Sequence, residues 1–571
     1  MPTVLVNGQE VQLGADERLN VIQAAAKAGV EVPHYCWHPA LSVVASCRMC
    51  LVEVGERKPD GSVAMQPRVV PGCQTPVRDG SIVVTNSDKV KEAQAATLEY
   101  LLLNHPLDCP VCDQAGECFL QDYSYKFGRA ESRLKDDKLI KPDKDHIGAE
   151  ISLFTDRCVM CTRCVRFTRE ISGTAELQVI NRGDHAEIDI FPGAPCDNKL
   201  AGNVVDICPV GALCSKDFLY QQRVWFLQEA QSVCPGCATG CSIDVSQNKN
   251  IVYRLTPRYN PRAQGHFMCD EGRFGYKYIN SKDRLTTPLA RQEGGHVPVS
   301  WDALLPTLRR ELAAATKEPE APFAVVLSPW LTVEEAYLAA QYFKGLSSAV
   351  ILALGPVPVV GSDDLFPKGP RGEPPRDPSQ VTFTIRAEKC PNRLGVEMIL
   401  CHFQGEVIPF AQILENIRSG KVKQLYVAAS SPTPWLAAGE ADLLGKLTRC
   451  FVQDLLPSPA LAAARYVLPG GSFAEKDGTF VHHGYLAQQI KRAINAPGEA
   501  RPDARIFHDL LQRRGLFHAP SVRKEMAQVV PGLEPLAVGD LGELGVWVGP
   551  EAGRNPARTA EKAPLAVQAT S

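Results

Sequence analysis

Four groups of cysteines contain the residues whose types and spacing could do chemistry in this sequence. The chain of 571 residues has 20 cysteines, and 16 of them lie between Cys36 and Cys241, mostly in tight local groups. Closely spaced thiolates bind zinc or iron-sulfur clusters, whereas disulfide scaffolds are small secreted proteins that rarely repeat CxxC. The clustering therefore favours metal binding over disulfide bonding.

The first group consists of Cys36, Cys47, Cys50 and Cys73. A CxxC flanked by single cysteines is similar to the plant-type [2Fe-2S] arrangement, although ten residues separate the first two cysteines in place of the usual four. Small residues in that loop leave backbone amides free to point at sulfur, which helps to set the potential of a cluster. We expect a [2Fe-2S] cluster here, with a zinc site as the alternative.

The second group has the spacing HxxxCxxCxxxxxC and consists of His105, Cys109, Cys112 and Cys118. A helix is predicted over 88–104, and it must end at His105 because a proline follows. The helix thus delivers the imidazole into the cysteine loop. A neutral imidazole in place of a thiolate removes one negative charge, which should raise the potential of a cluster. A zinc site with three cysteines and one histidine is the alternative.

The third group consists of Cys158, Cys161, Cys164 and, 44 residues later, Cys208. A CxxCxxC run with a distant Cys-Pro is the bacterial ferredoxin arrangement, but Thr168 stands where a ferredoxin with two clusters has its own fourth cysteine. We therefore expect one [4Fe-4S] cluster rather than two. Zinc, which seldom takes such a run, is the alternative.

The fourth group is spaced CxxCxxxC and consists of Cys234, Cys237, Cys241 and, after 27 further residues, Cys269. This spacing suits zinc as well as a cluster, so both remain open here. The sequence has further cysteines outside the four groups, which are Cys196, Cys214, Cys390, Cys401 and Cys450. We expect these to be buried thiols rather than ligands.

The elements that must position these groups can be predicted in outline. An Asn-Gly pair at 7–8 predicts a β-hairpin, a helix is expected before Gly29, and strands are predicted over 50–54 and 82–85. The first 85 or so residues therefore form a small α+β domain. A charged stretch over 129–145 is typical of a linker or surface loop.

Beyond residue 288 the pattern changes. Strands predicted over 323–327 and 425–427 alternate with helices predicted over 301–314 and 333–343, which indicates an α/β domain. The last twenty or so residues are polar and contain proline and alanine, so we expect a disordered tail.

Composition excludes several classes of function. A net charge of −3 offers no attraction for nucleic acid, and no stretch reaches the ~18 apolar residues that span a bilayer. The first residues contain no basic segment followed by an apolar run, so we expect the chain to stay in the cytoplasm. No GxGxxG follows a predicted strand, so NADH and flavin would belong to partner chains.

Five segments, taken in order, resemble the large iron-sulfur G-subunit family of bacterial NADH:quinone oxidoreductase, respiratory complex I. They are YCWHPALSVVASCRMCLVEV, HPLDCPVCDQAGEC, DRCVMCTRCVRF, GNVVDICPVGAL and CPGCATGC, and the resemblance covers about residues 1–285. It implies a β-grasp domain with a [2Fe-2S] cluster and then three [4Fe-4S] clusters, the first bound by His105 and three cysteines. It also implies that the first three groups lie between flavin and quinone, with the fourth off the main path.

The same resemblance implies an assembly. The partners would be the flavin and NADH-binding subunit and the quinone-side iron-sulfur subunits, in a peripheral arm on the cytoplasmic side of the bacterial inner membrane. This chain would contain no catalytic residue and no membrane span.

The second half more faintly resembles the molybdopterin oxidoreductase fold, on Val467–Pro469 and Glu475–Phe480. The residues His482 to Tyr485 stand where related sequences have an Asn and an Arg, which implies a reduced α/β scaffold without pterin. The expected fold class is thus multidomain α+β and α/β. The expected domains are 1–85 (β-grasp [2Fe-2S]), 86–146 (His/Cys helical [4Fe-4S] region), 147–228 (ferredoxin-like [4Fe-4S]), 229–287 (molybdopterin-oxidoreductase-type [4Fe-4S]), 288–550 (scaffold) and 551–571 (tail).

Other functions fit part of the pattern. The electron-transfer subunit of an NAD-linked hydrogenase or formate dehydrogenase would have a similar first half. The catalytic subunits of those enzymes need either a full pterin domain with a metal-binding cysteine or selenocysteine, or further paired cysteines. The three isolated cysteines after residue 300 provide neither. A zinc-stabilised assembly protein is the alternative without redox chemistry.

Overall fold

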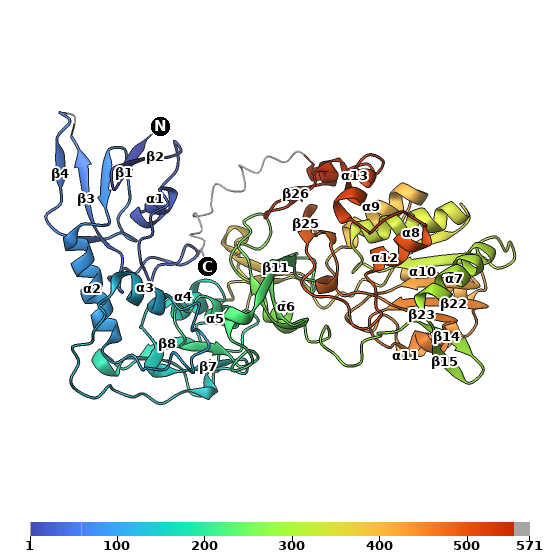
Figure 1. The fold of residues 1–571 in the computed structure, drawn as a ribbon, viewed down its shortest axis with the longest axis horizontal. Coiled ribbons are helices and arrows are strands. Elements are labelled where there is room, and N and C mark those ends of the chain that lie inside the picture. The colour runs from blue at the N-terminus through green and yellow to red at the C-terminus, as the bar shows by residue number, and fades with distance from the viewer. Residues whose placement is uncertain (1, 59, 553–571) are drawn as a thin grey trace. The chain divides into compact units, whose positions relative to one another are not determined.

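The computed structural model describes residues 2–58 and 60–552. The chain divides into two compact units (Figure 1). Unit 1 contains the residues up to Leu227 together with Leu365–Phe383, and unit 2 contains Gln228–Asp364 and the described residues from Thr384 onward. The tail predicted over 551–571 lies, from residue 553 on, outside the described residues.

Unit 1 begins with the predicted hairpin, whose Asn7 and Gly8 both have positive φ, as its tight turn requires. A helix and a mixed sheet follow, in the order β2-β1-β6-β3-β4, with β5 paired to β3. The elements are β1 (Thr3–Val6), β2 (Gln9–Gln12), α1 (Val21–Lys27), β3 (Leu51–Arg57), β4 (Val63–Met65), β5 (Val70–Pro71) and β6 (Ser81–Val84). Apolar residues of the strands and of α1 share one buried core, so the predicted α+β domain is confirmed.

Two helices flank the second cysteine group in the sequence. The predicted helix over 88–104 is confirmed as α2 (Asp88–Leu102), and α3 (Phe119–Phe127) begins directly after Cys118. Short elements then surround the third group: β7 (Ile151–Leu153), α4 (Arg163–Glu170), β8 (Leu177–Ile180), β9 (Glu187–Ile190), α5 (Asn203–Asp206) and β10 (Leu213–Ser215). β7 pairs with β10 and β8 with β9, both antiparallel.

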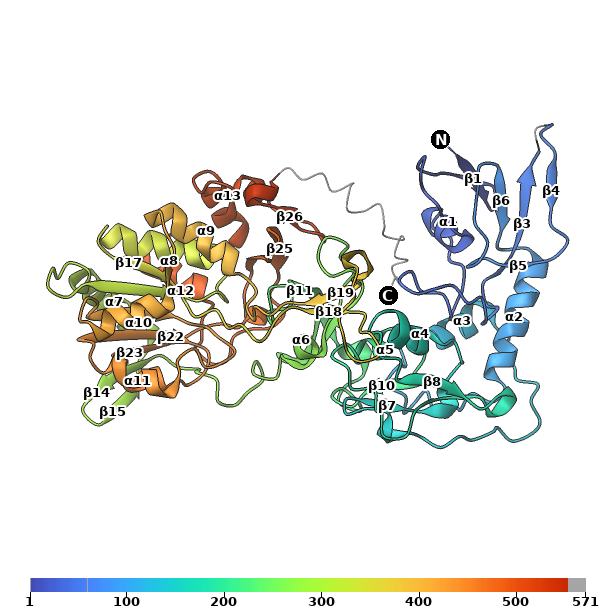
Figure 2. The same ribbon diagram turned by 180° about the vertical axis from the view of Figure 1, so that it is seen from behind.

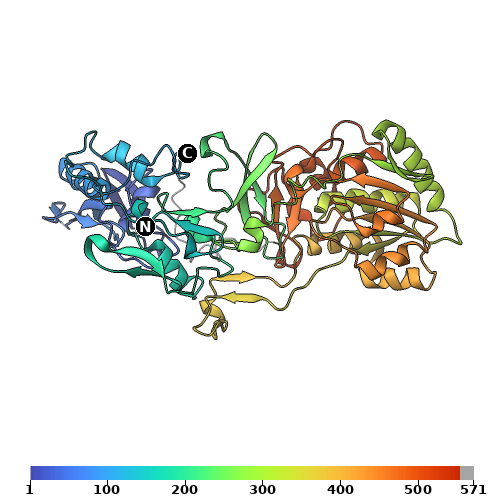
Figure 3. The same ribbon diagram turned by 90° about the horizontal axis from the view of Figure 1, so that it is seen from below.

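A segment from the second half of the chain belongs to unit 1. The strands β18 (Asp364–Phe366) and β19 (Phe383–Ile385) run side by side and lead into it (Figure 2). Figure 3 shows this arm in yellow, from below. The backbone N–H of Lys368 donates to the carbonyl of Ser172 at 2.7 Å, and the Thr382 hydroxyl donates to that of Ile171 at 3.1 Å. The arm therefore packs where α4 ends.

Unit 2 opens with an antiparallel sheet of β11 (Gln228–Val233), β12 (Ser242–Asn248) and β13 (Ile251–Pro257), followed by α6 (Asp270–Phe274). This small subdomain contains the fourth cysteine group. A further antiparallel sheet comes late in the chain and consists of β24 (Gly478–Val481), β25 (Leu486–Ile490) and β26 (Val546–Trp547).

The core of unit 2 is an eight-stranded sheet in the order β15-β14-β23-β22-β21-β16-β17-β20. Its strands are β14 (Leu289–Gln292), β15 (Gly295–Pro298), β16 (Phe323–Leu327), β17 (Ile351–Leu354), β20 (Ile408–Pro409), β21 (Gln424–Ala428), β22 (Arg449–Asp454) and β23 (Tyr466–Pro469). The run from β23 to β20 is parallel. From β16 the chain adds β17 and β20 on one side, and it then adds β21 on the other side of β16. The direction of strand addition therefore reverses between β16 and β21.

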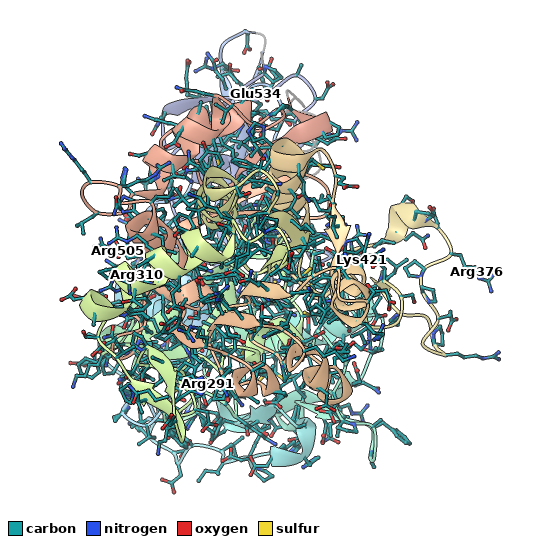
Figure 4. The ribbon with its side chains drawn as sticks, turned by 90° about the vertical axis from the view of Figure 1, so that its right-hand side faces the viewer. Arg291, Arg310, Arg376, Lys421, Arg505 and Glu534 are labelled. Carbon is teal, nitrogen blue, oxygen red and sulfur yellow. The ribbon has the colours of Figure 1, made fainter. Side chains whose placement is uncertain are left out.

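Helices cover both faces of this sheet, which confirms the predicted α/β pattern (Figure 1). One face holds α7 (Trp301–Ala315), α8 (Val333–Leu346), α9 (Arg393–Gln404), α12 (Asp503–Leu510) and α13 (Ala519–Ala527). The other holds α10 (Phe410–Arg418) and α11 (Ala438–Leu444). The exposed charged side chains labelled in Figure 4, such as Arg310, Lys421 and Glu534, lie on the outside of the unit.

One expectation about the spare cysteines is wrong. Cys196, Cys214, Cys390 and Cys450 are buried as expected, but Cys401 is exposed. Helix α9 turns Val396, Ile399 and Leu400 into the core, so Cys401 lies on its outer side. Within the part of the chain that the structure describes, none of the helices combines the length and apolar character that a membrane span requires.

Two ion pairs of the same geometry differ in burial. Arg284 donates to both carboxylate oxygens of Glu475 at 2.8 Å, and both side chains are 1% exposed. Arg465 binds Glu311 through two similar hydrogen bonds, but its side chain is 50% exposed. A buried charge that loses its partner is costly, whereas water compensates an exposed one.

We therefore expect Arg284→Met to lower the free energy of unfolding by about 3–5 kcal/mol, because it leaves the Glu475 carboxylate buried without its cation. The matched variant Arg465→Met should cost no more than about 1 kcal/mol. Urea unfolding of the full chain, followed by far-UV circular dichroism, measures both. Equal destabilisation by the two variants would contradict the expectation that the buried Arg284–Glu475 pair contributes more to stability than the exposed pair.

Candidate iron-sulfur sites

The structure brings the four cysteines of the first group together. Cys36 forms hydrogen bonds with the thiols of Cys47 and Cys73, which lower its pKa well below the ordinary value, and the backbone N–H of Cys73 donates to Cys50 Sγ at 3.5 Å. The connecting loop turns through positive φ at Ala45 and Arg48. Backbone N–H groups of Ser46 and Cys47 reach the Cys36 sulfur in this loop. The loop thus has backbone amides that point at a cysteine sulfur, as the sequence predicted.

The second group lies between α2 and α3. Cys112 and Cys118 are 9% exposed and interact electrostatically, while Cys109 is exposed. Burial lowers the pKa of His105 to about 4, so the imidazole is neutral at pH 7, which is the form that binds metal. Among the described residues no hydrogen bond joins His105 to the three thiols, so its place in this set remains a prediction.

Arg223 holds the loop of the second group in place. Its guanidinium donates to the carbonyls of Cys112 at 2.8 Å, Pro110 at 2.6 Å and Cys109 at 3.2 Å. The guanidinium lies 4.9 Å from the ring centroid of Trp225, whose side chain also faces Gly116. These contacts fix the backbone on which Cys109 and Cys112 stand.

The four thiols of the third group line one cavity. The walls also include apolar side chains of Leu153, Ile188 and Val210 and the basic side chain of Arg163. Burial raises the pKa of Cys158 to about 12 and that of Cys161 to about 11, so these thiols ionise only with help from a bound metal or a nearby cation. The apolar wall and the four soft donors suit an iron-sulfur cluster.

The fourth group likewise lines a cavity, with all four predicted cysteines in its wall. The backbone N–H of Cys234 donates to the carbonyl of Cys241 at 2.8 Å, which closes the loop on itself. Burial raises the pKa of Cys234 to about 12. The rest of the wall consists of Gly236, Met268, Glu271 and Gly272.

In the described residues no three His, Cys, Asp or Glu side chains converge closely enough to hold a single metal ion. The thiols of the third and fourth groups instead surround cavities. Sulfur donors that line a common cavity fit a polynuclear cluster, in which each thiolate binds a different iron.

Buried arginines connect the sites, and sequence reasoning missed them. Arg166 donates to the carbonyl of Cys36 in the first group at 2.5 Å and to that of Cys161 in the third at 3.2 Å. Arg157 binds Asp108, next to Cys109, at 2.7 Å. The signal was available, because the segment DRCVMCTRCVRF places arginines beside its cysteines.

The second and third groups also approach each other directly. The backbone N–H of Phe119 donates to the carbonyl of Pro209 at 3.0 Å. A Cβ atom on Gly211 would lie 2.1 Å from Cys112 Sγ, so only glycine fits there. The loops of these two groups are therefore in van der Waals contact.

Five family models match the chain segment by segment. They are a 2Fe-2S iron-sulfur cluster binding domain over 2–88, the NADH-ubiquinone oxidoreductase-G iron-sulfur binding region over 94–133, the ferredoxin-like domain of NADH-quinone oxidoreductase subunit 3 over 148–214, the molybdopterin oxidoreductase Fe4S4 domain over 227–281, and molybdopterin oxidoreductase over 284–362 and 406–513. The expected fold class is confirmed by these matches and their order.

Curated relatives agree with these models. The G subunit of NADH-quinone oxidoreductase from Rickettsia bellii is 36% identical over 344 residues, 60% of this chain and 48% of the relative. The G subunit from Rickettsia typhi is 36% identical over 348 residues, 61% of this chain and 49% of the relative. The chain is thus similar to the G subunits of NADH-quinone oxidoreductase over about 60% of its length. It spans about half the length of these curated relatives.

A solved structure also matches this chain. It is the crystal structure of an NAD⁺-reducing [NiFe]-hydrogenase in the H2-reduced state, 26% identical, covering 39% of this chain and 91% of that chain with a TM-score of 0.34. A TM-score of this size is too low to support an inference about fold or function.

The glycines of the fourth group give a test of its geometry. A Cβ atom on Gly272 would lie 2.7 Å from Cys234 Sγ, whereas one on Gly236 would lie at an ordinary 3.5 Å from the same sulfur. We expect Gly272→Ala to lower the iron bound by the reconstituted chain by about one cluster, although alanine favours a helix. Gly236→Ala should bind as much iron as the unmodified chain. Iron and sulfide analysis measures both, and an unchanged iron content in Gly272→Ala would refute the predicted crowding.

Proposed function

We propose that this chain is an iron-sulfur electron-transfer subunit of NADH:quinone oxidoreductase, the proton-translocating complex I. In that role it passes electrons from the subunit that binds NADH and FMN toward quinone. The observation that supports this most directly is the contact between the loops of the first three cysteine groups. Separate structural zinc sites would not need such contacts, whereas electron tunnelling does, because its rate falls steeply with distance.

The proposed ligands follow the predicted groups. A [2Fe-2S] cluster is bound by Cys36, Cys47, Cys50 and Cys73. Three [4Fe-4S] clusters are bound by His105, Cys109, Cys112 and Cys118, by Cys158, Cys161, Cys164 and Cys208, and by Cys234, Cys237, Cys241 and Cys269. The domain limits predicted above are proposed with them.

The contacts support an order for electron transfer that differs from the order of the sequence. The first site meets the third through Arg166, and the third meets the second through Gly211 and Phe119. We therefore infer the path first, third, second. The exposed Cys109 leaves the second site nearest to solvent, where an acceptor on another chain can approach it.

The proposed partners are the other subunits of the peripheral arm of complex I. They are the flavin and NADH-binding subunit, as donor, and the quinone-side iron-sulfur subunits, as acceptors. The proposed location is the cytoplasmic side of the bacterial inner membrane. Similarity to the G subunits of Rickettsia species supports this assignment.

The second half is proposed to be a scaffold without molybdopterin. In a doubly wound sheet a ligand binds beyond the carboxyl ends of the strands where the topology reverses, here beyond β16 and β21. Buried charges fill that place: Lys476 binds Glu335 at 2.7 Å and Asp503 at 3.4 Å, and the exposed fraction of each side chain is at most 2%. Ser430, just after β21, donates to Asp503 as well. This packing supports the proposal that the crevice beyond β16 and β21 is filled by side chains and has no room for a pterin.

The decisive test of the proposed function is low-temperature EPR, with iron and zinc analysis, on the anaerobically reconstituted chain before and after dithionite. One [2Fe-2S] signal and up to three [4Fe-4S] signals are expected. Replacing His105 by Ala should alter one [4Fe-4S] signal, because it removes a proposed ligand. Stoichiometric zinc without an EPR signal would mean a structural metal protein.

His146 provides a matched control for the histidine. It is exposed and lies outside the four groups, so His146→Ala should leave every signal unchanged. If both histidine variants have the spectrum of the unmodified chain, His105 is not a ligand.

A separate prediction concerns the cofactor. The chain purified from cells grown with ample molybdenum should release no fluorescent pterin after acid oxidation and should contain no molybdenum by elemental analysis. Stoichiometric pterin would show that the crevice beyond β16 and β21 opens. A molybdopterin enzyme purified from the same cells provides the positive control.

A further inference from the structure

Arg163 is the first residue of α4 and lies between two proposed ligands of the third site, Cys161 and Cys164. Its side chain is nearly buried, at 5% exposure. One terminal nitrogen, Nη1, donates to the carbonyl of Ile207 at 3.1 Å, next to the proposed ligand Cys208. The other, Nη2, donates to the carbonyl of Trp37 at 2.7 Å, next to the proposed ligand Cys36. Both ends of the guanidinium fork are thus fixed.

The third nitrogen of this guanidinium, Nε, has no hydrogen-bond partner among the described residues. Arg163 Nε is buried and forms no hydrogen bond within the described part of the chain. A buried N–H without an acceptor costs about 1–3 kcal/mol, and more for a charged group, so native proteins rarely leave one. Arg163 also lines the cavity that the four thiols of the third group surround. The unsatisfied donor therefore belongs to a side chain in the wall of a proposed cluster site.

We propose that Arg163 is a positioning residue for the third site, and that its Nε–H donates a hydrogen bond to a sulfur atom of the cluster bound there. This inference rests on the proposed function. Hydrogen bonds to sulfur and nearby positive charge both favour the reduced form of a cluster and raise its reduction potential. Reduction adds one electron to the cluster, and the guanidinium keeps its protons throughout.

Lysine cannot supply the same arrangement. Its ammonium is a point charge on a flexible stem, whereas a guanidinium holds several donors in one plane. At this position the two terminal nitrogens bind carbonyls of different loops while Nε stays available. The guanidinium carbon also lies 5.8 Å from the ring centroid of Phe119, the residue after the proposed ligand Cys118. One side chain thus contacts the loops of three proposed sites.

The neighbouring arginines are less suited to this role. Arg157 and Arg166 also have one buried nitrogen each without a hydrogen bond among the described residues. Neither, however, is part of the wall of the cavity of the third group. The terminal nitrogens of Arg166 donate hydrogen bonds to the carbonyls of Cys36, Ser42 and Cys161, so this side chain links loops. The donor to sulfur is therefore assigned to Arg163.

The test is an EPR-monitored redox titration of the reconstituted full chain and of Arg163→Gln, Arg163→Lys and Arg169→Gln. Arg163→Gln should lower the equilibrium constant for reducing the third cluster about tenfold, or ~59 mV for one electron, and Arg163→Lys should lower it less. Arg169 is exposed on the same helix, so Arg169→Gln should change nothing. A potential of the third cluster in Arg163→Gln that equals that of the unmodified chain would overturn the proposal.

A second measurement needs no variant that could lose the cluster. The unmodified chain, labelled with [15N]arginine, should show coupling of an arginine nitrogen to the reduced third cluster in pulsed EPR. The absence of that coupling while the cluster signal is present overturns the assignment of Arg163. The absence of any signal from the third site overturns the proposed function itself, so the two failures are distinguishable.

Discussion

Negative charge in apolar surroundings is the constraint around which unit 1 is arranged. Thiols whose pKa burial raises, such as Cys158 and Cys161, bind iron only as thiolates, and their cavity is lined largely by apolar side chains. The compensating charge comes from arginines inside and beside the motif, because arginine keeps its charge when buried. Each of these arginines also donates a hydrogen bond to another loop. Charge compensation and the spacing of the sites are thus achieved by the same side chains.

The local features were predictable from the sequence because they depend on neighbouring residues. The Asn7-Gly8 hairpin, the helix after Ser87 and the α/β alternation beyond residue 288 follow from turn chemistry and periodicity. The third and fourth cysteine groups could also be assembled from the sequence, because most of their members are separated by only two or three residues, and in the structure each group lines one cavity. Their role as ligands stays a prediction. Helix limits differed by only a few residues, as they usually do.

Features that depend on long-range packing could not be predicted. Nothing in the sequence of 365–383 tells that this segment packs at the end of α4, almost two hundred residues earlier in the chain. The error at Cys401 has the same origin, because the exposed side of α9 is decided by which neighbours cover it. The contact between Gly211 and Cys112 is likewise visible only once two loops meet. The spacing of cysteines therefore predicts which residues form one group better than it predicts the contacts between the loops of different groups.

The α/β half also supports the loop of the fourth cysteine group. The loop 234–241 has buried backbone groups that need partners. Trp330 Nε1 donates to the carbonyl of Pro235 at 3.2 Å, and Gln488 Nε2 donates to that of Gly240 at 2.7 Å. The carbonyl of Glu388 accepts from the N–H of Ala238 at 2.9 Å.

These three partners come from separate places in the fold: the turn after β16, the strand β25 and the stretch that follows β19. They can meet around one loop only when the large sheet and the antiparallel sheet of β24 to β26 are both folded. Isolated from the α/β half, the loop would leave these groups unpaired, at a cost of about 1–3 kcal/mol each. The geometry of the fourth site is therefore a property of unit 2 as a whole and not of its cysteine motif.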